Sequence, residues 1–531
     1  NKLLSLTHQP LFAKDEEFHF GKWVAKVITF IVLLILAWGS WDLVKVEMQY
    51  PIDIAPNISR WVAQLIMPFG FLLMAFQIYI NSYANQKHRI TLIIVGLLFS
   101  LCAITGMAFD GIPIFYVGLI AISTSLFYGA PIVIGLGGLA IILFWTDYTP
   151  ISAIPAEAYR IVVSPTLPTI PLFTLAGYLL AESNASERLV KIFKELFGWI
   201  PGGTPIVIIL LCGFFTALTG GSGVTILALG GLLLPMLLKE GYSRSFSLGL
   251  LTVSGSIGLL FPPSLPAIIY GVTAGVSVKD VFLAGIVPGA VLISLISGWA
   301  LYQGRTQKII LNKFSLKKSL KASLYGKWEL CLPIIILFGV FGGFTTLVET
   351  AAITVIYVFI IEVFIYKDLT FSDMPRIVVD CSTLIGGVLI ILGVAMGLTS
   401  YLVDAQIPMA LLSWVKSNIS NKYTFLLVLN IFLLIVGCLM DIFSAIIVIV
   451  PLISPLGNYF GIEPVHLAII FIANLELGFL TPPVGMNLFL SAYRFNQPMP
   501  NIYKATLPFF LIKLIAVGLI TYIPIITLGL F

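Results

Sequence analysis

Two acidic residues lie inside long apolar runs in the second half of this 531-residue chain. Asp441 belongs to the run 423–456, and Glu476 belongs to the segment Ile472-Ala-Asn-Leu-Glu-Leu-Gly478. A charged side chain at bilayer depth costs roughly 2.5–3.5 kcal/mol on the mildest scales, so it usually has a partner. We therefore predict that Asp441 serves an ion or substrate site. For Glu476 we predict a structural role, in which it is protonated or bonded between helices.

A glycine- and proline-rich pattern occurs twice, and its second copy begins two residues after Glu476. Gly258-Leu-Leu-Phe-Pro-Pro-Ser264 recurs as Gly478-Phe-Leu-Thr-Pro-Pro-Val484, and the two copies are 220 residues apart (258 to 478). A proline pair cannot continue a helix, because it removes backbone donors and clashes with the preceding turn. Single prolines kink many membrane helices with no ligand nearby. Two broken helices at matching places in two repeats are instead typical of a secondary transporter.

Each predicted break is preceded by a polar or glycine-rich point inside an apolar run, where we expect the tip of a re-entrant hairpin. The first tip is Thr219-Gly-Gly-Ser-Gly223 in the run 205–238, and the second is Gly437-Cys-Leu-Met-Asp441. Glycines let the backbone approach a ligand closely. Amides at half-helix N-termini attract a carboxylate, and carbonyls at half-helix C-termini suit a sodium ion. For the first tip, the alternative is close helix packing through small residues.

The composition indicates that these elements lie in a membrane. Hydrophobic residues make up 59% of the chain, charged residues only 10%, and the mean hydropathy is +1.06. A soluble domain is about half apolar and about a quarter charged. We predict an all-α polytopic membrane protein, because the apolar runs are too long and too continuous for the alternating strands of a β-barrel.

Other counts exclude several classes of function. The chain has no GxxxxGK[ST] phosphate loop, so it does not hydrolyse ATP by that route. Its four histidines have no metal-ligand spacing, and its five cysteines lie in apolar runs without a CxxC pair, as small buried hydrophobes do. The net charge of +5 is more typical of cytoplasmic loops than of a protein that binds nucleic acid.

The apolar runs predict the elements that must position the two tips. Spans are expected at 23–41, 61–80, 90–109, 112–146 (interrupted at 129–131), 164–183, 281–303, 328–345, 349–366 and 505–531. Residues 184–200 are expected to form an amphipathic helix on the membrane surface, with Arg188 on its polar side. The segments 85–89 and 305–327 are basic and are predicted to be cytoplasmic, although 305–327 could instead bind anionic lipid. No cleavable signal peptide opens the chain.

From Pro168 onward the chain resembles the large membrane subunit of tripartite ATP-independent periplasmic (TRAP) transporters. The matching motifs are Ile170-Pro-Leu-Phe173 with Ala176-Gly177, the first tip, Leu260-Phe-Pro-Pro-Ser264 and Leu480-Thr-Pro-Pro-Val-Gly-Met-Asn487, with Asp441 where the family commonly has an aspartate. Residues 23–81 resemble the last two helices of the family's small membrane subunit. We therefore expect a fused protein. Residues 1–89 would be a partial small subunit, 90–111 a connecting transmembrane helix, and 112–531 the large subunit with repeats at about 164–303 and 328–495.

This resemblance implies an inverted-repeat, elevator-type transporter of the bacterial inner membrane. It would be driven by two or more co-transported sodium ions and fed by a soluble periplasmic substrate-binding protein. Two features of this chain depart from the family pattern. The small subunit ordinarily has four helices and only two are visible, so its N-terminal part is expected to be absent. The first tip reads Gly-Gly-Ser-Gly where many relatives are richer in serine, which leaves the substrate open.

On this basis we predict one substrate site between two sodium sites. The first sodium site would use Thr219, Gly220, Ser222, Gly258 and Pro262, and the second Gly437, Asp441, Gly478, Thr481 and Pro482. A small organic carboxylate would bind near Gly221, Ser222, Gly223, Ser264, Asp441 and Asn487. The rival interpretations are a stand-alone sodium–anion symporter, which needs no extra N-terminal spans, and an intramembrane enzyme, which needs a nucleophile–base or metal constellation.

Overall fold

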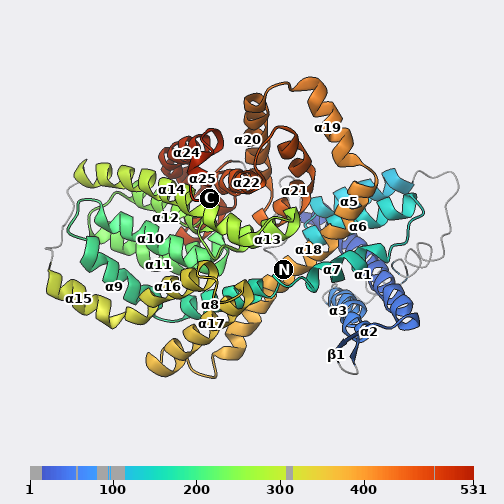
Figure 1. Cartoon of the computed structure of the whole chain (residues 1–531), viewed down its shortest axis with the longest axis horizontal. Helices are drawn as coiled ribbons and strands as arrows, with labels where there is room; N and C mark the ends of the chain where they lie inside the picture. Colours follow the sequence, from blue (N-terminus) through green and yellow to red (C-terminus); the bar gives the residue numbers. More distant parts are fainter. Residues whose placement is uncertain are drawn as a thin grey trace. The chain divides into compact units, whose positions relative to one another are not determined.

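The computed structural model describes residues 15–55, 58–80, 94, 96, 114–306, 315–482 and 485–531, and these residues are almost entirely helical (Figure 1). Among them, nine helices are long and apolar enough to cross a membrane, or up to eleven when each bent pair counts as one span. One two-stranded antiparallel sheet, β1 (Asp53–Ala55) with β2 (Ile58–Ser59), interrupts the helices. The predicted all-α membrane class is therefore confirmed, apart from this short hairpin.

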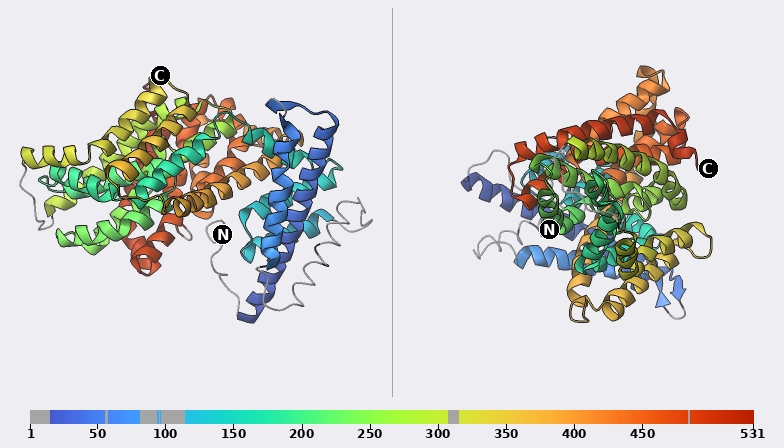
Figure 2. Two further views of the ribbon diagram at one scale, coloured as in Figure 1. Left: turned by 90° about the horizontal axis from the view of Figure 1, so that it is seen from below. Right: turned by 90° about the vertical axis from the view of Figure 1, so that its left-hand side faces the viewer.

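The chain divides into two compact units, and the first contains residues 1–164 together with 386–410. Its described helices are α1 (Asp15–Gln49), α2 (Arg60–Gln64), α3 (Ile66–Ile80), α5 (Ile114–Phe127), α6 (Ile132–Thr146), α7 (Ala153–Val162) and the second part of α18 (Met374–Asp404). Helix α1 covers the predicted span 23–41, and α2 and α3 together cover the predicted span 61–80. Helices α1 and α3 run side by side (Figure 2). The predicted connecting helix 90–111 and the basic segment 85–89 lie outside the described residues, except for residues 94 and 96.

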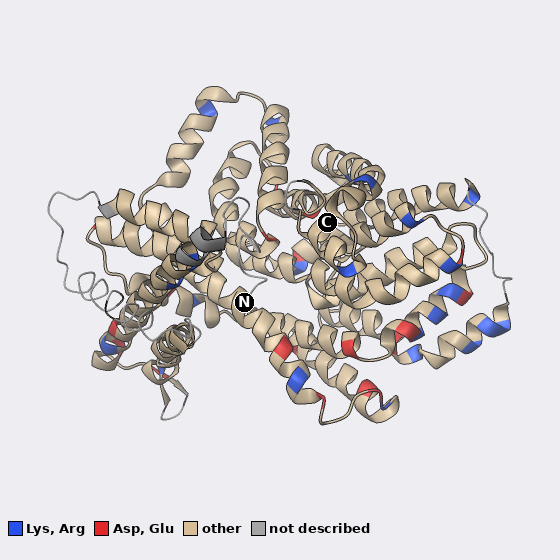
Figure 3. Ribbon diagram, turned by 180° about the vertical axis from the view of Figure 1, so that it is seen from behind, with Lys and Arg blue, Asp and Glu red and all other residues tan. Residues whose placement is uncertain are grey.

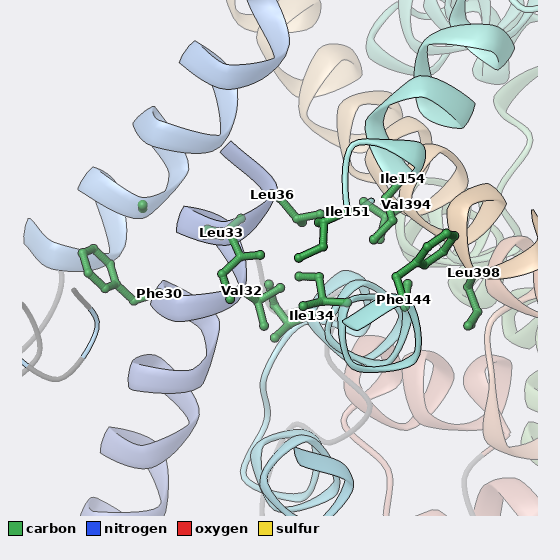
Figure 4. Close-up of a cluster of buried hydrophobic side chains, with 14 of the residues drawn as sticks. Phe30, Val32, Leu33, Leu36, Ile134, Phe144, Ile151, Ile154, Val394 and Leu398 are labelled. Atoms are coloured by element: carbon green, nitrogen blue, oxygen red, sulfur yellow. The ribbon is translucent and has the colours of Figure 1, made fainter. Parts of the chain in front are cut away.

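The first unit is held together by an apolar core that draws side chains from distant parts of the sequence. Leu33 and Leu36 of α1 pack with Ile134 and Phe144 of α6 and with Val394 of α18 (Figure 4). All five side chains are at least 96% buried. Burying a leucine-sized side chain contributes roughly 1.5–3 kcal/mol, so this cluster fixes α18 against the N-terminal helices. The interruption predicted at 129–131 is present, because Gly129 adopts a φ of 90° between α5 and α6.

The second unit contains residues 165–385 and 411–531 and holds both halves of the predicted repeat. Its first half comprises α8 (Thr169–Glu182), α9 (Ala185–Phe197), α10 (Gly203–Thr219), α11 (Ser222–Lys239), α12 (Arg244–Ser254), a 3₁₀ turn (Ile257–Leu260), α13 (Leu265–Ala274) and α14 (Val278–Thr306). Helix α15 (Leu316–Tyr325) follows the first half. The predicted second repeat, 328–495, comprises α16 (Lys327–Phe341), α17 (Leu347–Ile360) with a π-helical turn (Ile361–Ile365), α18, α19 (Ile407–Asn418), α20 (Lys422–Leu439), α21 (Ile442–Tyr459), α22 (Pro464–Gly478) and α23 (Met486–Phe495). Helices α24 (Met499–Tyr522) and α25 (Ile525–Leu528) follow it.

Charged residues are sparse along the ribbon (Figure 3). Within the basic segment 305–327, residues 316–325 form helix α15. Lys317, Lys318 and Lys321 are exposed on this helix, while Ser319 and Ala322 are buried and the helix packs on α9. Of the cysteines, Cys212, Cys381 and Cys438 are buried as predicted. Cys331 is only half-buried, so the prediction is wrong for that residue.

Helix α9 is amphipathic as predicted, but the assignment of Arg188 to its polar side is wrong. Arg188 is only 5% exposed, and its guanidinium binds three carboxylates, those of Glu329, Glu362 and Asp368. Tyr366 covers the guanidinium, with its ring centroid 3.8 Å from Cζ. Burial would raise the pKa of Asp368, but hydrogen bonds from Arg188 and from the Asn184 backbone outweigh it and hold that pKa below its ordinary value. This arginine ties α9 to α16 and to the end of α17.

Candidate transport site

Each repeat contains a helical hairpin followed by an interrupted helix, as the sequence predicts. In the first repeat α10 and α11 lie side by side and meet at Gly220-Gly221, where Gly220 adopts a φ of 68° (Figure 1). The hydroxyl of Thr216 on α10 donates to the carbonyl of Gly255 at 2.8 Å and lies 2.7 Å from the hydroxyl of Thr225 on α11. The hairpin is therefore closed on itself and bonded to the end of α12.

The first interrupted helix bends by 43° between its α12 and α13 halves. A methyl group on Gly258 would lie 2.1 Å from the carbonyl oxygen of Gly213, so only a glycine permits this approach to α10. Gly220 at the tip meets the side chain of Leu265, the first residue of α13. The first tip and the first break, predicted to share a sodium site, are thus in direct contact.

The second repeat has the same arrangement, about 220 residues further along the chain. Helices α20 and α21 form its hairpin, and residues 479–485 separate α22 from α23, with 483–484 outside the described part. A methyl group on Gly478, the counterpart of Gly258, would lie 2.6 Å from Cα of Gly437 in the second tip. The Cys438 carbonyl accepts from the Gly485 amide at 3.3 Å, and the Cys438 thiol donates to the Thr481 carbonyl at 3.2 Å.

The close approach at Gly258 leads to a prediction. Replacing Gly258 by alanine forces a methyl group into the α10 backbone, and such overpacking costs about 1–3 kcal/mol or more. We expect the variant to have a lower unfolding temperature and a lower yield of folded protein in detergent. Gly298→Ala on α14 is the matched control, because no described atom lies within 4 Å of its added methyl group. Equal unfolding temperatures for the two variants would contradict the tight contact.

The two repeats meet through the predicted substrate residues Ser222 and Asn487. The Ser222 hydroxyl, at the start of α11, donates to the Asn487 side-chain oxygen at 2.7 Å. The Asn487 amide, on α23, donates to the carbonyl of Thr252 at 3.3 Å. Ser222 is 1% exposed and Asn487 is fully buried. A methyl group on Gly223 would lie 2.6 Å from the Leu490 side chain, so α11 packs tightly on α23.

Asp441 is the N-cap of α21. Its carboxylate accepts from the backbone amides of Phe443 and Ser444, both at 3.0 Å, and from the Ser444 hydroxyl at 2.6 Å. A carboxylate at a helix N-terminus satisfies orphan amides and favours the helix dipole. The residue is half-buried, so one face of this acidic cap remains accessible.

The predicted site residues are therefore brought together only in part. Gly220 and Ser222 lie at the first tip, with Gly221 between them as the N-cap of α11. Gly258, at the first break, packs on α10 beside Gly213 and Ala217 and not on the tip residues themselves. Gly437, Gly478 and Thr481 gather at the second break, and Pro482 follows Thr481 on the surface. Thr219 and Ser264 bond locally, to the carbonyls of Phe215 (2.9 Å) and Leu259 (2.5 Å). No described hydrogen bond joins Ser264 or Asp441 to the Ser222–Asn487 pair, so the predicted six-residue substrate cluster is not assembled as one network.

Sequence reasoning missed several polar residues around these breaks. Ser254, which ends α12, and Ser491, one turn after Asn487 on α23, are fully buried, and their hydroxyls have no hydrogen-bond partner among the described residues. Lys513 of α24 is buried and bonded to Glu476, which confirms an interhelical bond for that glutamate. Only the repeat offset could have pointed to this group, because positions 254 and 256 correspond to Asn474 and Glu476.

Two hairpins, each packed on an interrupted helix in equivalent repeats, define the class of secondary transporters with broken helices. Comparison with known proteins identifies the family. A family model described as "Tripartite ATP-independent periplasmic transporter, DctM component" matches residues 117–526. The chain therefore belongs to the TRAP transporters, as a multi-pass permease of the bacterial inner membrane.

Individual relatives agree with this assignment. The chain is 30% identical over 515 residues to the isethionate TRAP transporter permease protein DctMQ of Oleidesulfovibrio alaskensis, covering 94% of this chain and 80% of that protein. It is 33% identical over 396 residues to the C4-dicarboxylate TRAP transporter large permease protein DctM of Pseudomonas aeruginosa, covering 74% and 92%. The ectoine TRAP transporter large permease protein TeaC of Halomonas elongata is 28% identical over 407 residues. The longer match to a DctMQ permease confirms the fusion of small and large subunits.

Proposed function

We propose that this permease imports a small organic carboxylate by sodium-coupled symport. The observation that carries the proposal is the buried bond between Ser222 and Asn487, which places the N-terminus of α11 beside the helix that follows the second break. The first amides of a helix have no partner within it, and they attract anions. Relatives named for isethionate and for C4-dicarboxylates support an anionic substrate.

Sodium is proposed because the ends of the broken elements supply oxygen ligands. Backbone carbonyls at the end of α10 and around Gly258 would bind one ion, and those around Gly437 and Thr481, with the Asp441 carboxylate, would bind another. Hard cations prefer such oxygen ligands. The absence of a phosphate loop from the sequence agrees with coupling to an ion gradient.

An elevator mechanism is proposed because one compact unit carries every residue of the proposed sites. Both hairpins and both interrupted helices belong to the second unit, whereas α1, α3, α5 and α6 belong to the first. In our proposal the second unit carries substrate and ions together across the membrane. The first unit would serve as the scaffold that stays fixed in the membrane. Its N-terminal helices would stabilise this scaffold and enlarge the surface that binds a periplasmic binding protein.

Uptake by reconstituted protein tests these proposals. We expect proteoliposomes to accumulate substrate only with an inward sodium gradient and only after the cognate binding protein is added outside. The substrate itself would first be identified from the metabolites that raise the unfolding temperature of that binding protein. An equal rate in potassium-only buffer would contradict sodium coupling. An equal rate without the binding protein would instead favour the stand-alone symporter.

A further inference from the structure

A buried cation joins the two repeats at positions that the proposed transport sites do not use. Lys513 of α24 donates to the Glu476 carboxylate at 2.5 Å and to the Ser256 hydroxyl at 3.0 Å. Lys513 is 1% exposed, and both partners are fully buried. Ser256 and Glu476 are 220 residues apart, so they occupy the same position in the two repeats, two residues before Gly258 and Gly478. Helix α24 packs on both α12 and α22.

The cluster of Lys513, Glu476 and Ser256 resembles a cation-binding site in which the cation is a lysine side chain. Glu476 and Ser256 supply oxygen atoms from opposite repeats, the ligand type that hard cations prefer. The second carboxylate oxygen of Glu476, Oε2, has no hydrogen-bond partner among the described residues. A buried ion pair is seldom worth more than apolar side chains of the same volume, so packing alone does not explain why the chain places a charge here.

We propose that the Lys513 ammonium is a tethered cation, which fills a cation site formed by Glu476 and Ser256 and so excludes free sodium from it. The ammonium neutralises Glu476 in every step of transport, and the site adds no ion to the stoichiometry. The inference rests on the proposed function only in naming sodium as the free cation that would otherwise enter. Removing the ammonium but keeping the carboxylate should therefore create a sodium-dependent protein.

The test compares thermal unfolding of the full-length protein in detergent, in sodium, potassium and choline chloride at equal ionic strength. Lys513→Met should unfold at a lower temperature than wild type in choline. Sodium should restore part of the loss, so that the sodium-minus-choline difference exceeds that of wild type by several degrees. Lys513→Met/Glu476→Leu, which lacks the carboxylate, should show no sodium response beyond the wild-type one. Equal sodium responses in all three proteins would overturn the proposal.

If Lys513→Met cannot be purified in choline, its yield after extraction in sodium replaces the unfolding temperature. Recovery in sodium alone supports the tethered cation. Failure in every salt, while the double variant purifies normally, overturns it, because sodium then cannot replace the ammonium. The readout is folding and not uptake. Wild-type uptake that ignores sodium would refute the proposed function and leave this comparison unaffected.

Discussion

Arg188→Gln is expected to cost about 3–5 kcal/mol of folding free energy, the usual result of removing one partner from a buried ionic group. The substitution leaves the carboxylates of Glu329 and Glu362, both at most 1% exposed, without their cation. It also breaks the ion pair with Asp368 and removes the guanidinium that stacks on the Tyr366 ring. We expect a large fall in the unfolding temperature of the purified protein, and loss of folded protein if the wild type is only marginally stable.

Arg376→Gln is the matched control, because Arg376 pairs with Glu182 at 2.7 Å while its own side chain is 56% exposed. Exposed pairs contribute about 0–1 kcal/mol, so this variant should unfold near the wild-type temperature. Similar losses for the two arginine variants would show that the Arg188 cluster is no more important than a surface pair.

The response to acid gives a second readout for the Arg188 cluster. Because the folded-state pKa of Asp368 lies below its ordinary value, Asp368 stabilises the wild type above its unfolded-state pKa, and this contribution is lost as the pH falls through the folded value. In Arg188→Gln the uncompensated carboxylates gain from protonation instead. Acid below the ordinary pKa of Asp368 should therefore narrow the gap in unfolding temperature between Arg188→Gln and wild type.

The hairpins and breaks could be predicted from the sequence because their chemistry is local. Gly220 adopts a left-handed φ, Gly258 and Gly478 approach a neighbouring backbone, and adjacent prolines end a helix wherever they occur. The repeat offset of 220 residues then placed the equivalent elements in the two halves. Hydropathy alone located the apolar parts of α1, α3 and α14, which the predicted spans 23–41, 61–80 and 281–303 overlap.

The ionic contacts could not be predicted, because their partners are far apart in the sequence. Arg188 meets Glu329 and Asp368 across 141 and 180 residues, and helical periodicity placed it on the polar side of α9. Lys513 lies in the otherwise apolar last span, and its partner Ser256 is 257 residues away. From the sequence alone, a single charged residue in an apolar segment is interpreted as exposed to solvent or as part of a functional site. Whether it forms an ion pair depends on how the helices pack in three dimensions.

Asp441→Asn is expected to reduce sodium-driven uptake about ten- to hundredfold, the equivalent of roughly 1.5–3 kcal/mol for a contact with a charged group. The asparagine oxygen can still accept from the amides of Phe443 and Ser444, so the start of α21 should remain capped and the unfolding temperature should stay near that of wild type. Asp441→Ala removes the cap as well, and should lower stability by about 1 kcal/mol in addition to the loss of uptake.

Glu463→Gln is the matched control for Asp441→Asn, because it also removes the charge of a helix N-cap, but at a position away from the second tip. Glu463 is the N-cap of α22 and accepts from the His466 amide at 2.8 Å, but it lies outside both tips and both breaks. Uptake by Glu463→Gln should match wild type under the same sodium gradient, because only a cap is altered. If Asp441→Asn also transports normally, the Asp441 carboxylate is a cap and nothing more, and the second sodium site must rely on backbone oxygens. If Asp441→Asn instead loses uptake while its unfolding temperature is unchanged, the charge of Asp441 is assigned to ion binding. The unchanged temperature would show that the variant keeps the wild-type cap.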